Sequence, residues 1–169
     1  MGILDILQQY ADPARAQAGN VQAHFDQVAQ QASPQDLGSG IAAAFRSDQT
    51  PPFGEMIGSL FGQSNPQQRA GILNQLTQVL GGGALASVAG GGLASVLGGA
   101  SAAGAPITPE QASQISPSQA AAIAASAHKQ DPSILDRAGE FYSQHPDLVK
   151  GLGAAALAIA LGKMHSNQA

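Results

Sequence analysis

Residues 107–119, ITPEQASQISPSQ, contain the same helix-start signal twice. Thr108 and Ser116 each precede a proline, and a glutamine follows each of them three positions later. A hydroxyl at this position can accept a hydrogen bond from the first helical turn, and the glutamine can return one to the capping backbone. Proline suits the first helical position, because the N–H that it lacks would have no partner there. The stretch therefore predicts two consecutive helix starts.

The same punctuation recurs along the chain, at Asp12-Pro13, Ser33-Pro34, Asn65-Pro66, Asp131-Pro132 and, more weakly, His145-Pro146. Apolar residues spaced three and four apart accompany these starts, which is typical of helices buried on one face. The stripes are Val21, Phe25, Val28 and Ala32; Leu37, Ile41 and Phe45; Phe53, Met56, Ile57, Leu60 and Phe61; Ile72, Leu73, Leu76, Val79 and Leu80; and Leu148, Val149, Leu152, Ala156 and Ile159. No stretch alternates with a period of two. We predict an all-α protein of about eight to ten short helices.

Composition divides the 169 residues into an N-terminal helical lobe at 1–80, a Gly/Ala-rich apolar segment at 81–106, a C-terminal helical lobe at 107–164 and a polar tail at 165–169. In the apolar segment the sequence LASV occurs at 85–88 and again at 93–96, and no charged residue lies between Arg69 and Glu110. The segment is interpreted as a flexible linker with two apolar turns. Two short helices that pack closely through Gly and Ala, or a membrane-inserting segment, are the alternatives.

The charge balance argues against nucleic acid as a partner. Seven Lys and Arg against eleven Asp and Glu give a net charge of −4, so a dense phosphate-neutralising surface is not expected. The chain has no cysteine, which excludes disulfides and thiolate metal sites. Met1 to Tyr10 show no basic region typical of a secretory signal, and we expect a cytoplasmic protein.

Motifs that carry chemistry are weak in this sequence. GLGAAA at 151–156 has the shape of a dinucleotide fingerprint, but no strand is predicted before it. The tripeptide at 145–147, HPD, marks J-domain cochaperones, where it follows a basic helix that is missing here. His24, His128, His145 and His165 lack zinc-ligand spacing, so a solvated or partly buried structural role is expected for each. No serine lies in a nucleophile-elbow pattern. We therefore predict a non-enzymatic protein with no catalytic, cofactor-binding or metal-binding residues.

Residues 148–161 are the most hydrophobic stretch. As a helix, the uncharged residues 151–162 would span about 18 Å, short of a bilayer core. We expect a central helix buried by its neighbours. An interfacial or self-associating helix is the alternative.

The opening MGILD at 1–5, the Gly-rich middle and the closing Ser-Pro-x-Gln with its small-residue helix resemble the bacterial YidB-like proteins, which carry the domain of unknown function 937. The segment that runs from AAFRSD at 43–48 to FGQ at 61–63 resembles a recurrent pattern in hypothetical proteobacterial relatives. The resemblance implies a multihelical fold with two small bundles. It implies no activity, cofactor or site residue.

The apolar segment suggests what the protein does. It lacks the bulky side chains of a core, yet it is too apolar for a well-solvated linker, so contact with another surface would stabilise it. We predict a structural or interaction protein that associates with itself or with another protein, with contacts expected at Leu85, Val88, Leu93, Val96 and Leu97. The alternative is a membrane-surface or membrane-inserting protein that uses residues 81–106 and 148–161.

Overall fold

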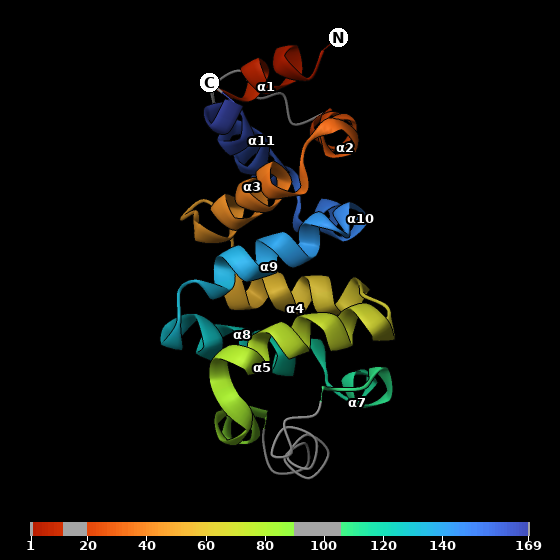
Figure 1. Cartoon of the computed structure of the whole chain (residues 1–169), viewed down its shortest axis with the longest axis vertical. Coiled ribbons are helices and arrows are strands. Elements are labelled where there is room, and N and C mark those ends of the chain that lie inside the picture. Colours follow the sequence, from red (N-terminus) through yellow and green to blue (C-terminus); the bar gives the residue numbers. More distant parts are fainter. Residues whose placement is uncertain (1, 12–19, 90–105, 169) are drawn as a thin grey trace. The chain divides into compact units, whose positions relative to one another are not determined.

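The computed structural model describes residues 2–11, 20–89 and 106–168, and in these residues it contains helices and no strand (Figure 1). The all-α prediction is therefore confirmed for the described part of the chain. In order, the elements are α1 (Ile3–Ala11), α2 (Val21–Gln31), α3 (Pro34–Arg46), α4 (Phe53–Gln63), α5 (Pro66–Ala89), α7 (Pro109–Ser113), α8 (Pro117–Gln130), α9 (Ile134–Ser143), α10 (Pro146–Val149), a 3-10 turn η1 (Lys150–Leu152) and α11 (Ala154–Gln168).

The two predicted capping boxes are confirmed. Thr108 Oγ1 accepts from the backbone N–H of Gln111 at 3.3 Å, while the side chain of Gln111 accepts from the N–H of Thr108 at 3.0 Å. Ser116 and Gln119 repeat the arrangement at 3.2 and 2.9 Å, at the start of α8. The same reciprocal pair forms between Asn65 and Gln68 at the start of α5, at 2.8 and 3.0 Å. Ser33 caps α3 by accepting from the N–H of Asp36 at 3.1 Å.

Two of the other predicted starts differ from the structure, and the Asp12-Pro13 start lies outside the described residues. Asp131 is the C-cap of α8, and its carboxylate accepts from the N–H of Ser133, so α9 begins only at Ile134. His145 does precede α10, but its side chain makes no capping hydrogen bond and the helix lasts four residues. A capping side chain before proline thus marks either the start of a helix or a loop between two helices, because the same side chains form hydrogen bonds in both places.

Residues 148–161 do not form the single helix that their hydrophobicity suggested. The stretch is divided into α10, η1 and α11, and the break lies at Gly153, whose φ is 94°. Glycine adopts this conformation readily, whereas a residue with Cβ rarely does. Apart from its chain neighbours, no described residue comes within 4 Å of a Cβ built at Gly153, so this glycine serves the turn and not a close helix contact.

The helices group into two compact units. Unit 1 comprises residues 1–51 and 138–169, so both flanks of the chain contribute to it, and unit 2 comprises the continuous residues 52–137. The predicted boundaries at 80 and 107 both fall inside unit 2. Composition changes at those positions, but helices group by the faces that they bury together, and α5 buries residues against α7 and α8.

In unit 1, α11 is the central element, because α3, α1 and α2 all pack on it. Val21, Phe25 and Val28 of α2 and the whole predicted stripe of α3 are buried there, as are Ile6, Leu7 and Tyr10 of α1. Ala32, the last residue of the first stripe, follows the end of α2 and is partly exposed. On α11 the buried residues are Ala156, Leu157, Ala160, Leu161 and Met164. The backbones approach closely at Gly40 of α3, where a Cβ would lie only 2.7 Å from the carbonyl oxygen of Ala160. This confirms that the second half of the 148–161 stretch is a helix buried by its neighbours.

In unit 2, α8 packs on both α4 and α5, and α7 packs on α5. The whole predicted stripe of α4 is buried, together with Ile72, Leu73, Leu76 and Leu80 of α5, while Val79 is partly exposed. Helix α8 contributes Ala120, Ile123, Ala124 and Ala127. Most of these α8 residues are alanines, so the core of unit 2 depends on close helix contact more than on large side chains.

Candidate interaction region

The apolar segment begins at a kink in α5. Gly81 has a φ of 73° and a ψ of 161°, which is not helical, and the helical backbone resumes after it up to Ala89. This conformation is essentially restricted to glycine. Gly81 is exposed, and nothing in the described part of the chain lies within 4 Å of a Cβ built on it. Within the described residues, the kink therefore changes the direction of the helix without a packing contact at Gly81 itself.

At the other end of the segment, the side-chain amide of Asn74 holds Ile107. The backbone N–H of Ile107 donates to Asn74 Oδ1 at 2.7 Å, and Asn74 Nδ2 donates to the carbonyl oxygen of Ile107 at 3.3 Å. Ile107 is buried, so both of its backbone polar groups would be costly to leave unpaired. Helix α7, with buried Ala112, then packs on α5 and continues the attachment.

Both ends of the segment are thus attached to the same unit. The sequence suggested that residues 81–106 join two lobes. In the structure Gly81 and Ile107 both belong to unit 2: Gly81 lies within α5, and Ile107 is hydrogen-bonded to Asn74 of the same helix. The connections between the units lie elsewhere, after Pro51 and within α9.

The predicted contact residues fall at the edge of what the structure describes. Leu85 and Val88 belong to the helical backbone of α5 beyond Gly81, and their side chains lie outside the description. Leu93, Val96 and Leu97 lie outside the described residues. Asn74, which sequence reasoning missed, carries no motif: an amide on a helix looks like any other polar residue until its partner, 33 positions away, is known.

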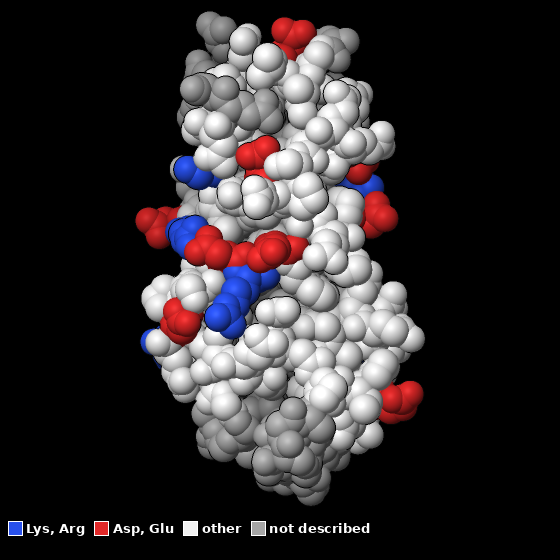
Figure 2. Space-filling model, in the orientation of Figure 1, with Lys and Arg blue, Asp and Glu red and all other residues white. Residues whose placement is uncertain are grey.

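Arg69, the last charged residue before the segment, uses its side chain for contacts within unit 2. Its Nε donates to the carbonyl oxygen of Phe61 at 3.0 Å and its Nη2 to that of Gly62 at 3.3 Å. Its guanidinium carbon also lies 5.1 Å from the centre of the Phe61 ring. A cation at these carbonyls neutralises the negative end of the α4 dipole. Because no charged residue follows Arg69 in α5, much of the face over this helix in Figure 2 shows neither a basic nor an acidic side chain.

Replacing Asn74 with alanine is expected to lower the free energy of unfolding by about 1–3 kcal/mol, because it leaves the buried backbone groups of Ile107 without a partner. Chemical denaturation followed by circular dichroism measures this change. The matched control is Gln78→Ala, an exposed position one turn further along α5, where no loss is expected. Equal stability of the two variants would show that the amide does not hold Ile107.

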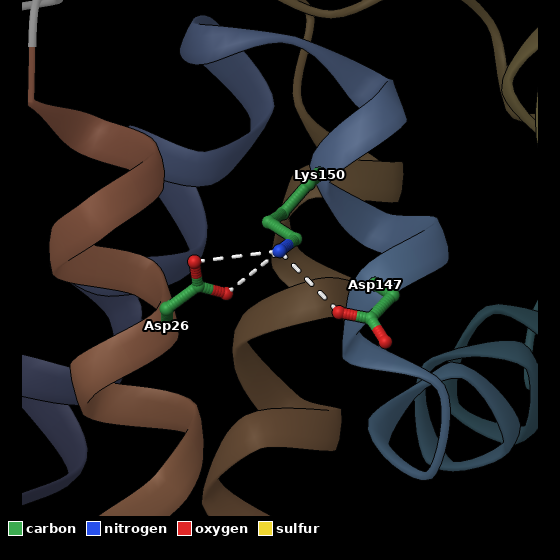
Figure 3. Close-up of polar contacts among 3 residues, drawn as sticks. All are labelled: Asp26, Asp147 and Lys150. Atoms are coloured by element: carbon green, nitrogen blue, oxygen red, sulfur yellow. Dashed lines mark hydrogen bonds and ion pairs between the residues drawn. The ribbon is translucent and has the colours of Figure 1, made fainter.

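Unit 1 has a polar contact that ties α2 to the start of η1 (Figure 3). Lys150 Nζ lies 3.0 Å from Asp26 Oδ1 and 3.3 Å from Asp147 Oδ1, and it donates to Asp26 Oδ2 at 3.3 Å. These hydrogen bonds, first to Asp26 and then to Asp147, raise the pKa of the Lys150 ammonium. The stabilisation is complete below the pKa of an unfolded lysine and is lost as pH rises through the higher folded value. The contact is a structural ion pair at the protein surface.

The histidines lie beside aromatic rings or in helix packing. His24 Nδ1 is hydrogen-bonded to the hydroxyl of Tyr10 at 2.8 Å, while His128 and His145 contact Phe53 and Phe141 edge-on or tilted. All four histidines are partly exposed. Among the described residues no group of three His, Asp or Glu side chains is placed to hold a metal ion.

Tyr142 is the largest fully buried side chain of unit 1, and its hydroxyl has no hydrogen-bond partner among the described residues. The ring lies against Phe45 of α3 and Phe141 of α9. Burial raises the pKa of the phenol far above its ordinary value, so the group stays neutral. A buried hydroxyl without a partner destabilises the fold.

Tyr142→Phe is therefore expected to raise the free energy of unfolding by about 1 kcal/mol, because it removes the unpaired hydroxyl and keeps the ring. The control is Tyr10→Phe, where the hydroxyl bonds His24 and a loss of about 0.5–1.5 kcal/mol is expected. Thermal and urea unfolding of the two variants should thus shift in opposite directions. A destabilised Tyr142→Phe would mean that the hydroxyl has a partner in solution.

Comparison with known proteins adds no assignment: no family model matches the chain, and neither do the curated proteins or the solved structures. In residues 2–11, 20–89 and 106–168, none of the helices is both long and apolar enough to cross a membrane.

Proposed function

We propose that this chain is a non-enzymatic interaction protein that associates with itself through the Gly/Ala-rich segment at 81–106. The observation that carries the proposal is the double hydrogen bond between Asn74 and Ile107. It attaches the far end of the segment to the helix from which the near end departs, so unit 2 supports the segment at both ends. This arrangement suits a segment that is presented to a partner better than one that connects two bodies.

The chemistry of the segment supports contact with an apolar, uncharged surface. Interface cores are depleted of charged residues, and no charge occurs between Arg69 and Glu110. Leucine and valine that remain in water forgo about 1.5–3 kcal/mol each relative to burial. The repeated LASV at 85–88 and 93–96 supplies such side chains twice, eight residues apart. A second copy of the same segment is a partner with matching chemistry.

We assign the contacts to Leu85, Val88, Leu93, Val96 and Leu97. Their flanking glycines and alanines leave them as the main large apolar groups of the segment. We also propose that the chain belongs to the YidB-like family and that its helices form two small bundles. The family adds no residue role to it.

Introducing aspartate at Val88 and Val96 together is expected to abolish self-association, because each copy would then bury charges in the contact. Light scattering behind size exclusion, over about a hundredfold range of protein concentration, measures the mass directly. The natural chain should exceed 16.9 kDa as concentration rises, whereas the double variant should stay at that mass.

The matched control is Gln67→Asp with Ser118→Asp. It adds the same charge at two exposed first-turn positions of unit 2 helices, where a carboxylate suits the helix dipole. It should assemble like the natural chain. A natural chain that stays at monomer mass throughout, or a Val88/Val96 variant that assembles normally, would refute the proposal.

Binding to lipid is the competing outcome. The side chains of α11 that a membrane would need, such as Leu157 and Leu161, are buried in unit 1, so the lipid hypothesis rests on residues 81–106 alone. Co-sedimentation with phosphatidylcholine–phosphatidylglycerol vesicles at low salt separates the two functions. Binding that the Val88/Val96 variant loses, by a chain that is monomeric in solution, would replace self-association with membrane association.

A further inference from the structure

We draw no further inference here: the strongest candidate, the buried Tyr142 hydroxyl where α9 meets α3 in unit 1, carries nothing, because the described rings around it are aromatic and nothing in the structure shows what would bind it.

Discussion

Replacing Gly54 and Gly58 together with alanine is expected to lower the free energy of unfolding of unit 2 by about 4 kcal/mol or more. A Cβ on Gly54 would lie 2.7 Å from the carbonyl oxygen of Ala121, and one on Gly58 would lie 2.8 Å from that of Pro117. Both obstacles are backbone atoms of α8, which cannot rotate away as a flexible side chain could. The helices would have to separate, and the alanine-rich contact of α4 with α8 would lose its packing along its length.

Gly62→Ala is the matched control on the same face of α4, one turn further along. Gly62 is exposed, and the first atom that its Cβ would meet is Pro117 Cγ at 3.5 Å, an ordinary contact. Because alanine favours a helix over glycine, this variant should gain about 0.5–1 kcal/mol. Opposite signs in chemical denaturation are the expected result. A double variant as stable as the natural chain would show that α4 and α8 are further apart in solution.

Gly139→Ala is expected to lower the free energy of unfolding of unit 1 by about 3 kcal/mol. A Cβ at this position in α9 would overlap the carbonyl oxygen of Gly38 in α3, and it would lie 3.0 Å from the backbone nitrogen of Ala42. The gain in helix propensity, about 1 kcal/mol, is too small to offset a forced movement of two packed backbones.

The opposite partner of this contact provides its control. A Cβ on Gly38 would lie 3.3 Å from Glu140 Cα, which a small shift can relieve. Gly38→Ala should therefore change stability much less than Gly139→Ala. Similar losses for both substitutions would contradict the asymmetry of the contact.

The chain provides a convenient way to assign these losses to a unit. It has no tryptophan and two tyrosines, Tyr10 and Tyr142, and both belong to unit 1. Tyrosine fluorescence therefore follows unit 1, while circular dichroism follows the helices of both units. Gly139→Ala should shift the fluorescence transition. The Gly54/Gly58 variant should shift the dichroism transition more than the fluorescence, unless the two units unfold as one.

Local signals in the sequence predicted local structure well. Thr108 and Gln111 lie three positions apart, so the capping box needs nothing beyond one helical turn. The stripe of α4 is likewise a property of eleven consecutive residues. Both were confirmed because a helix start and a helix face are decided mainly by neighbours in sequence.

Signals that depend on distant partners were missed. The role of Asn74 follows only from its contact with Ile107, which lies far away in the sequence. The break at Gly153 leaves no signal in the sequence, because the stretch around it is as hydrophobic as a continuous buried helix. The spacing of Gly54, Gly58 and Gly62 could have indicated a close helix contact, because positions four apart share a helix face. It could not have named α8 as the neighbour.

The way unit 1 is assembled from both flanks of the chain has a consequence during synthesis. Helices α1 to α3 emerge from the ribosome first, but α11, on which all three pack, is made after the whole of unit 2. Translation of the intervening residues takes on the order of ten seconds. Unit 2 is continuous in sequence and can fold in that interval. The apolar faces of α2 and α3 stay unpaired until α11 has been made. Nascent chains stalled before residue 138 should therefore depend on chaperones more than the finished protein does.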